Sequence, residues 1–186
     1  MKKSISLILF GALIFTLAAP NAGAQDAGAI LEKMFKAQGG KELLKAAKNV
    51  TISGTMELVQ QGLEGTITIY AKDPEKRRMD IEIMGMLITQ AYDGETAWFT
   101  NPQTGAVEEM TEDQTIQMKR EAIGYNAYLY PEKYGITFTY KSKETIEEKD
   151  YHVLEMKYPD DFKVMIYVDT ETYLDYNCCE LGICRQ

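Results

Sequence analysis

The residues that could carry out chemistry are few in this chain, and they are scattered. His152 is the only histidine, and the serines beyond residue 24 are Ser53 and Ser142. Neither serine stands in a strand-turn-helix elbow that would present it as a nucleophile to a histidine base. A single histidine also excludes zinc sites built on several of them. We therefore interpret His152 as an ordinary strand residue.

Carboxylates are numerous, but their setting is typical of solvated turns. The pairs Glu108-Glu109, Glu147-Glu148 and Asp160-Asp161 lie between predicted strands, without an apolar context that would favour the protonated form. Gly39-Gly40 is not a phosphate-binding loop, because a helical segment rather than a strand precedes it. The sequence thus predicts a protein that is not an enzyme and that uses no cofactor.

Three cysteines, Cys178, Cys179 and Cys184, crowd the end of the chain. In an oxidising compartment we expect Cys184 to pair with Cys178 or Cys179, because a disulfide between neighbouring residues is strained. A soft-metal site of three thiolates is the alternative, but a chain end supplies neither a rigid frame nor imidazole neighbours. We predict no metal site and leave the pairing and the role of the thiols open.

The amino terminus has the pattern of an export signal. Two lysines precede an apolar run over residues 5–19, and the small-residue triplet Ala22-Gly23-Ala24 follows. This order is typical of a signal peptide cut before Gln25, and the run is short for a membrane span. We therefore predict a leader over residues 1–24 and a single exported domain over residues 25–186.

The charge of the predicted domain excludes one class of partner. Removing the two leader lysines from 20 basic residues leaves 18 against 28 acidic ones, so the net charge moves from −8 to −10. Such a domain repels nucleic acid and anionic lipid headgroups at long range. We predict no nucleic-acid partner.

Hydrophobic periodicity predicts where helices and strands lie. Apolar residues recur at helical spacing over residues 27–47, with a break at Gly39-Gly40. The period changes to two over residues 50–58, 63–71, 79–83 and 86–92, which is typical of antiparallel strands with one dry face. A helical piece starts at Thr111, and strands follow over residues 136–140, 151–158, 162–168 and 172–176. This order predicts an α+β fold with one curved sheet and helices packed against it.

Residues 92–102, YDGETAWFTNP, form the most specific motif and contain the only tryptophan. The Asp93-Gly94 pair predicts a tight hairpin with positive φ at both residues. The stretch resembles the D-G-x-T-x-W-F-x-N-P hairpin of the LolA-like outer-membrane lipoprotein carriers and lipoprotein-sorting proteins of Gram-negative bacteria. The turn Lys72-Asp73-Pro74 and residues 166–174 are also similar to that family.

The resemblance covers residues 27–174 and implies both a fold and a function. The fold is an incomplete, unclosed β-barrel whose concave apolar face is covered by helices and receives acyl chains. Methionines on the strands adapt to irregular apolar ligands as well as to irregular cores, and the resemblance favours the ligand. Alternation along the strands selects these lipid-binding candidates: Ile52, Met56, Ile67, Ile69, Met79, Ile81, Ile83, Met86, Ile88 and Trp98.

The chain departs from the family pattern at two places. Carriers of this family have an arginine directly before the turn proline, which helps to hold and hand over the lipoprotein, whereas this chain has Asp73. Arg77 and Arg78 lie nearby, although spacing alone does not assign them that role. Relatives also continue with further strands beyond the segment that matches Leu174, where this chain has the cysteine-containing tail.

The expected function is therefore non-enzymatic binding in the periplasm. The protein would shield acyl chains of lipoproteins or other lipids during transport or sorting towards the outer membrane, with membrane-bound donor and acceptor proteins as candidate partners. The alternative is a periplasmic sensor or interaction domain of the same fold that recognises lipoproteins or an envelope partner.

Overall fold

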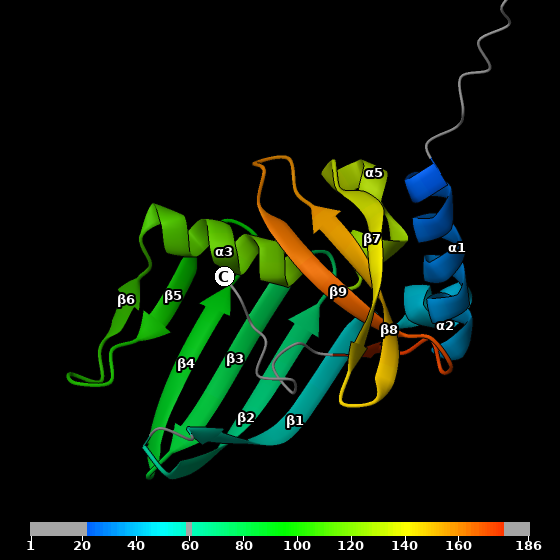
Figure 1. Cartoon of the computed structure of the whole chain (residues 1–186). Helices are drawn as coiled ribbons and strands as arrows, with labels where there is room; N and C mark the ends of the chain where they lie inside the picture. Colours follow the sequence, from blue (N-terminus) through cyan, green and yellow to red (C-terminus); the bar gives the residue numbers. More distant parts are fainter. Residues whose placement is uncertain (1–21, 59–60, 177–186) are drawn as a thin grey trace, which may run out of the picture.

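The computed structural model describes residues 22–58 and 61–176, which form an α+β arrangement with two open antiparallel sheets (Figure 1). The first sheet has the order β1 to β6, each strand beside its neighbour in sequence, and the second has the order β10-β9-β8-β7. The predicted α+β class and the unclosed barrel are thus confirmed. The strands divide between two sheets rather than one because the helices after β6 separate them.

The first sheet consists of β1 Asn49–Leu58, β2 Leu63–Lys72, β3 Lys76–Ile83, β4 Met86–Tyr92, β5 Ala97–Thr100 and β6 Val107–Glu109. The second consists of β7 Thr137–Ile146, β8 Lys149–Lys157, β9 Lys163–Asp169 and β10 Asp175–Tyr176. The helices are α1 Ala22–Ala37, α2 Lys41–Ala46, α3 Glu112–Ile123, α4 Asn126–Leu129 and α5 Pro131–Tyr134.

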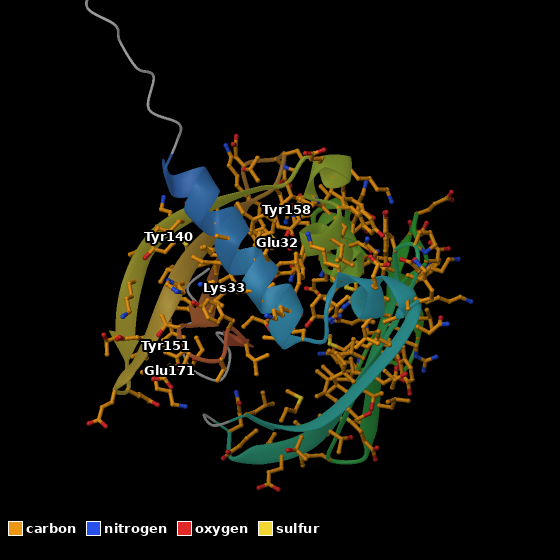
Figure 2. The ribbon with its side chains drawn as sticks, turned by 90° about the vertical axis from the view of Figure 1, so that its right-hand side faces the viewer. Glu32, Lys33, Tyr140, Tyr151, Tyr158 and Glu171 are labelled. Atoms are coloured by element: carbon orange, nitrogen blue, oxygen red, sulfur yellow. The ribbon has the colours of Figure 1, made fainter. Side chains whose placement is uncertain are left out.

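The larger core lies between α1 and the second sheet. Figure 2 shows α1 crossing the face of β7, β8 and β9. Met34 of α1, Leu154 of β8 and Val168 of β9 are completely buried there. Leu154 and Met156 point to the same face because side chains two residues apart on a strand share a face. This core anchors the amino-terminal helix to the carboxyl-terminal strands.

A smaller core lies between α3 and the first sheet. Met118 and Ala122 of α3 pack against Tyr92 and Ala97, at the ends of β4 and β5. The predicted helix start is confirmed, since Thr111 caps α3: its hydroxyl accepts from the Gln114 backbone N–H at 3.4 Å. The helix therefore lies across only one end of the sheet (Figure 1).

The hairpin between β4 and β5 differs from the predicted tight turn. Gly94 has a φ of 109°, whereas Asp93 does not enter the positive region. Instead, Asp93 Oδ1 accepts hydrogen bonds from the backbone N–H groups of Glu95 and Thr96, both at 2.9 Å. The Asp93 side chain thus satisfies the backbone of the turn, and β5 starts at Ala97.

Strand β7 is longer than the sequence predicts. It continues to Ile146, beyond the predicted end at Tyr140, with a register shift between Tyr140 and Ser142. The added segment is rich in charge and lacks apolar alternation, which is why periodicity does not detect it. A charged segment is suited to this position because β7 is an edge strand of its sheet.

Two predictions fall on residues at the ends of the chain. Helix α1 begins at Ala22, within the predicted leader, and residues 1–21 lie outside the described part. Export and cleavage before Gln25 stay predictions. Cys178, Cys179 and Cys184 also lie outside the described residues. Within residues 22–58 and 61–176, no helix has the length and apolar character that crossing a membrane requires.

The packing of the larger core predicts a large stability difference between two leucines. Leu154 is 0% exposed and Leu87 is 55% exposed. Leu154→Ala should lower the free energy of unfolding by about 3 kcal/mol, because it leaves a cavity between α1 and β8. Leu87→Ala should change it by less than about 1 kcal/mol. Urea unfolding measures both, and equal losses would contradict this placement of the core.

Candidate functional site

One face of the first sheet collects nine of the ten predicted lipid-binding residues. Residues directly opposite in an antiparallel pair point to the same face. Ile69 lies opposite Ile52 and Met79, and Ile81 lies opposite Ile67 and Ile88. The same register joins Met56, Ile83 and Met86 to this face. Tyr92 and Ala97, against which α3 packs, also point to this face. We therefore call it the inner face.

Most of the inner face is left partly uncovered. Ile83 is buried, but Ile52 on β1 is 57% exposed and Met86 on β4 is 47% exposed. The remaining members, Met56, Ile67, Ile69, Met79, Ile81 and Ile88, are half-buried. Helix α3 covers the Tyr92 end, and Ile52 and Met86 are the members of the face that are most open to solvent. A contiguous apolar surface of this kind marks a place where a ligand or a partner binds.

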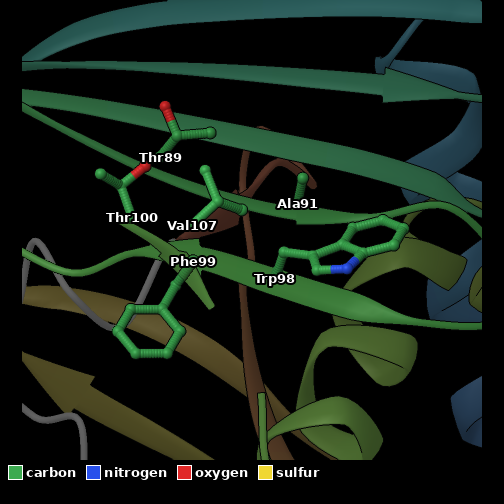
Figure 3. Close-up of a pocket in the computed structure, with 6 residues that line it drawn as sticks. All are labelled: Thr89, Ala91, Trp98, Phe99, Thr100 and Val107. Carbon is green, nitrogen blue, oxygen red and sulfur yellow. The ribbon is translucent and has the colours of Figure 1, made fainter. Parts of the chain in front are cut away.

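The tenth predicted residue, Trp98, lies on the opposite face, so its assignment to the inner face is wrong. Trp98 is opposite Ala91, whereas Phe99 is opposite Gln90 on the inner side. Figure 3 shows the Trp98 and Phe99 rings leaving β5 in different directions. Phe99 instead packs against the small core under α3.

The sequence contained the signal that would have placed Trp98 on the opposite face. A hairpin loop of two or four residues pairs even-numbered residues with odd-numbered ones. Since the inner residues of β4 are Met86 and Ile88, the inner residues of β5 have odd numbers. With either of these loop lengths Trp98 faces outwards, whereas a three-residue loop would turn it inwards. Register across the hairpin, rather than alternation within β5 alone, decides the face.

Of the two arginines near the β2–β3 turn, Arg77 alone belongs to the inner face. It lies opposite Tyr92, and its guanidinium is 3.2 Å from a Glu121 carboxylate oxygen on α3. Arg77 Nε is buried without a hydrogen-bond partner in the described part of the chain. Arg78 points to the other face, where its Nε donates to Asp80 Oδ1 at 2.8 Å. A partly satisfied cation thus borders the apolar surface.

Asp73, which replaces the family arginine, has a structural role. Its carboxylate accepts from Lys48 Nζ at 2.8 Å and from Asn126 Nδ2 at 2.9 Å. Its backbone N–H donates to the Lys48 carbonyl at 2.9 Å. These bonds tie the β2–β3 turn to α4 and to the segment before β1. The hydrogen bonds from Lys48 and Asn126 hold the pKa of Asp73 below its ordinary value.

His152 lies in β8 of the second sheet, as its interpretation as a strand residue expects. Its ring centroid is 6.0 Å from those of Tyr140 and Tyr173. Burial lowers its pKa, and the positive charges of Lys143 and Lys33 lower it further. The imidazole is therefore kept neutral among aromatic rings. Among the described residues, no three His, Cys, Asp or Glu side chains gather as a possible metal site.

Comparisons with known proteins give likenesses of fold. No family model and no curated protein matches the chain. Among solved structures, it is similar to a LolA superfamily protein from Nitrosomonas europaea, with 16% identity over 81% of this chain and 69% of that one and a TM-score of 0.45. It is also similar to a DUF1329 family protein from Desulfovibrio piger, with 12% identity, coverage of 80% and 70%, and a TM-score of 0.43. Likenesses at this level carry no argument about function, which has to come from the chain's own residues.

The environment of Asp73 predicts a pH-dependent contribution to stability. A carboxyl whose pKa is lowered in the folded state stabilises the fold above its unfolded pKa, about 3.9, and loses this contribution as the pH falls through the folded value. Asp73 is 31% exposed, so Asp73→Asn should lower the free energy of unfolding at pH 7 by only about 1 kcal/mol.

Urea unfolding at pH 7 and at pH 3 tests this expectation. The difference in the free energy of unfolding between wild type and Asp73→Asn should be smaller at pH 3. Glu57→Gln is the control, because Glu57 is exposed and makes no ion pair within the described residues. A gap for Asp73→Asn that stays constant with pH would contradict the role of its charge.

Proposed function

We propose that this protein is a non-enzymatic, exported binding protein that holds acyl chains of lipoproteins or other lipids against the inner face of the first sheet. The observation that supports this most directly is the gathering of nine isoleucine and methionine side chains on one incompletely covered face. A folded protein seldom leaves such a surface to water unless something binds there.

The composition of the inner face suits a long, flexible ligand. The isoleucines form a rigid apolar surface. The unbranched side chains of Met56, Met79 and Met86 adapt their shape to the ligand. Each buried methylene contributes about 0.8 kcal/mol, so ten methylenes would supply roughly 8 kcal/mol before the costs of association. Apolar contact alone is sufficient for useful binding without any catalytic group.

Arg77 supplies the polar end of the proposed site. It stands on the inner face two residues before Met79, and its buried Nε has no hydrogen-bond partner within the described residues. An unsatisfied buried donor costs free energy until an acceptor reaches it. We propose that a carbonyl or ester oxygen of the bound lipid accepts from Arg77 while the acyl chain runs along the isoleucines.

The proposed place of work is the periplasm, with delivery towards the outer membrane. This part of the proposal is supported by the leader pattern of residues 1–24 and by the resemblance of residues 92–102 to the carrier hairpin. Donor and acceptor proteins in the two membranes would load and unload the inner face. A sensor of the same fold would use the face to recognise a protein partner instead.

A lysine on the inner face should abolish binding of acyl chains. Ile81 lies between Ile67 and Ile88, so the charge of Ile81→Lys would sit in the centre of the apolar surface. We expect a loss of affinity for a fluorescent fatty acid of at least about tenfold, which corresponds to 1.4 kcal/mol. Thr66→Lys is the matched control, because Thr66 is exposed on the other face of the neighbouring strand, opposite Glu82.

One aromatic substitution refines this test. Trp98→Phe should leave fatty-acid affinity unchanged, because Trp98 is on the outer face, while circular dichroism verifies that each variant is folded. Native mass spectrometry of protein purified from the periplasm then separates carrier from sensor. Bound lipid or lipoprotein supports the carrier, whereas a stoichiometric protein partner without lipid, or unchanged binding in Ile81→Lys, contradicts it.

A further inference from the structure

The outer face of the first sheet has a hollow of its own, at the end nearest the β2–β3 turn. It is open to solvent and has a volume of about 230 Å³. A second hollow of about 210 Å³ adjoins it on the far side of Trp98 and is lined by Thr89, Thr100 and Val107 (Figure 3). The lining of the first, which we call the basic hollow, includes the side chains of Tyr70, Lys72, Lys76, Arg78 and Trp98, and one carboxylate, that of Asp93.

The register explains why a hollow forms there. Arg78 lies opposite Tyr70 on one side and Ala91 on the other, and Ala91 lies opposite Trp98. Ala91, the smallest side chain in this row, therefore lies between the two large side chains of Arg78 and Trp98. Ala91 is the floor, with the Trp98 and Arg78 side chains on either side of it.

Two of the cations at the hollow are placed unfavourably for the free protein. Lys72 and Lys76 are directly opposite each other at the turn end of the β2–β3 hairpin. Like charges directly opposite on a sheet destabilise it. Neither ammonium makes an ion pair within the described residues, whereas the neighbouring Lys48 is paired with Asp73. Such a repulsion between like charges is expected where a bound ligand supplies the opposite charge.

Two carboxylates lie near the hollow, and each uses its Oδ1 atom within the protein. Asp80 Oδ1 accepts from Arg78 Nε and from Thr89 Oγ1, both at 2.8 Å. Asp93 accepts the two backbone N–H groups of its own turn, and these hydrogen bonds hold its pKa below the ordinary value. The positive charge of Lys76 also contributes to lowering the pKa of Asp93. Neither carboxylate forms an ion pair or hydrogen bond with the Lys72 or Lys76 ammonium within the described residues, so both ammonium groups can donate to an external anion.

We propose that the basic hollow binds a small, soluble phosphate ester, with the phosphate between Lys72 and Lys76 and its organic part against the Trp98 indole. A phosphate monoester carries a charge of about −1.5 to −2 at pH 7, so it balances the charge of two ammonium groups better than a single carboxylate would. An aromatic wall then distinguishes an ester with a ring or alkyl portion from inorganic phosphate. The site is separate from the acyl-binding face and does not depend on it.

The remaining charges of the outer face argue against a flat anionic bilayer as the ligand. Glu57, Glu64 and Glu82 belong to the same face at the other end of the strands. With a net charge of −8 for the whole chain, this end would repel anionic headgroups while the basic hollow attracted them. A small ligand reaches the cations without bringing its charge near these carboxylates.

The only tryptophan of the chain gives the readout. We would titrate the protein with glucose 6-phosphate at constant ionic strength and follow Trp98 emission, with glucose and inorganic phosphate as separate titrations. We expect a saturable change with glucose 6-phosphate and a weaker affinity for each fragment. Lys72→Gln combined with Lys76→Gln should reduce the affinity at least about tenfold, since both charged partners of the phosphate are lost.

The matched control is Lys36→Gln combined with Lys119→Gln, which removes the same charge from exposed positions of α1 and α3 and should leave the affinity unchanged. The Lys72 and Lys76 double variant relieves a repulsion, so its melting temperature should equal or exceed that of the wild type. Its loss of binding therefore cannot be attributed to unfolding.

Three outcomes would overturn the proposal. The first is the absence of a saturable response to glucose 6-phosphate, or an equal response in the Lys72 and Lys76 double variant. The second is a response only to phosphatidylglycerol vesicles, which would identify a membrane surface. The third is a response to a hexaglutamate peptide but to no phosphate ester, which would identify an acidic protein segment as the ligand.

Discussion

The cross-strand register of the first sheet is the constraint on which the rest of this structure depends. Each of the strands β1 to β5 is paired with its sequence neighbour, and the loops between them set which residues share a face. A slip of one residue in any hairpin would exchange the two faces of that strand. The Asp93 turn matters most, because it places Ala97 and Phe99 under α3 and turns Trp98 outwards.

The larger core and the proposed binding face belong to different sheets. The second sheet is sealed by α1, with Met34 and Leu154 completely buried, and it ties the two ends of the described chain together. The first sheet is covered by α3 only at the Tyr92 end. Because the larger core does not need the inner face, that face can remain available to a ligand without loss of the fold. Asp73 and Arg77 lie where the first sheet contacts α4 and α3, respectively.

Much of this arrangement could be predicted from local pattern. The helix break at Gly39-Gly40, the start of α3 after Thr111 and the alternation of β1 to β4 all follow from short-range rules of periodicity and capping. The candidate site was largely predictable for the same reason, since nine of its residues alternate within single strands. The missed part of β7 shows the limit, because charged residues on an edge strand carry no apolar signal.

The sequence by itself thus determined the element types, the two-residue period of the apolar residues and the composition of the inner face, since each of these is a local property. Only the tertiary structure decided that the strands form two sheets, that Arg77 pairs with Glu121 of α3, and that Lys72 and Lys76 stand opposite each other beside Trp98. These features depend on loop geometry and on helix docking, which bring distant residues together and which no local pattern specifies.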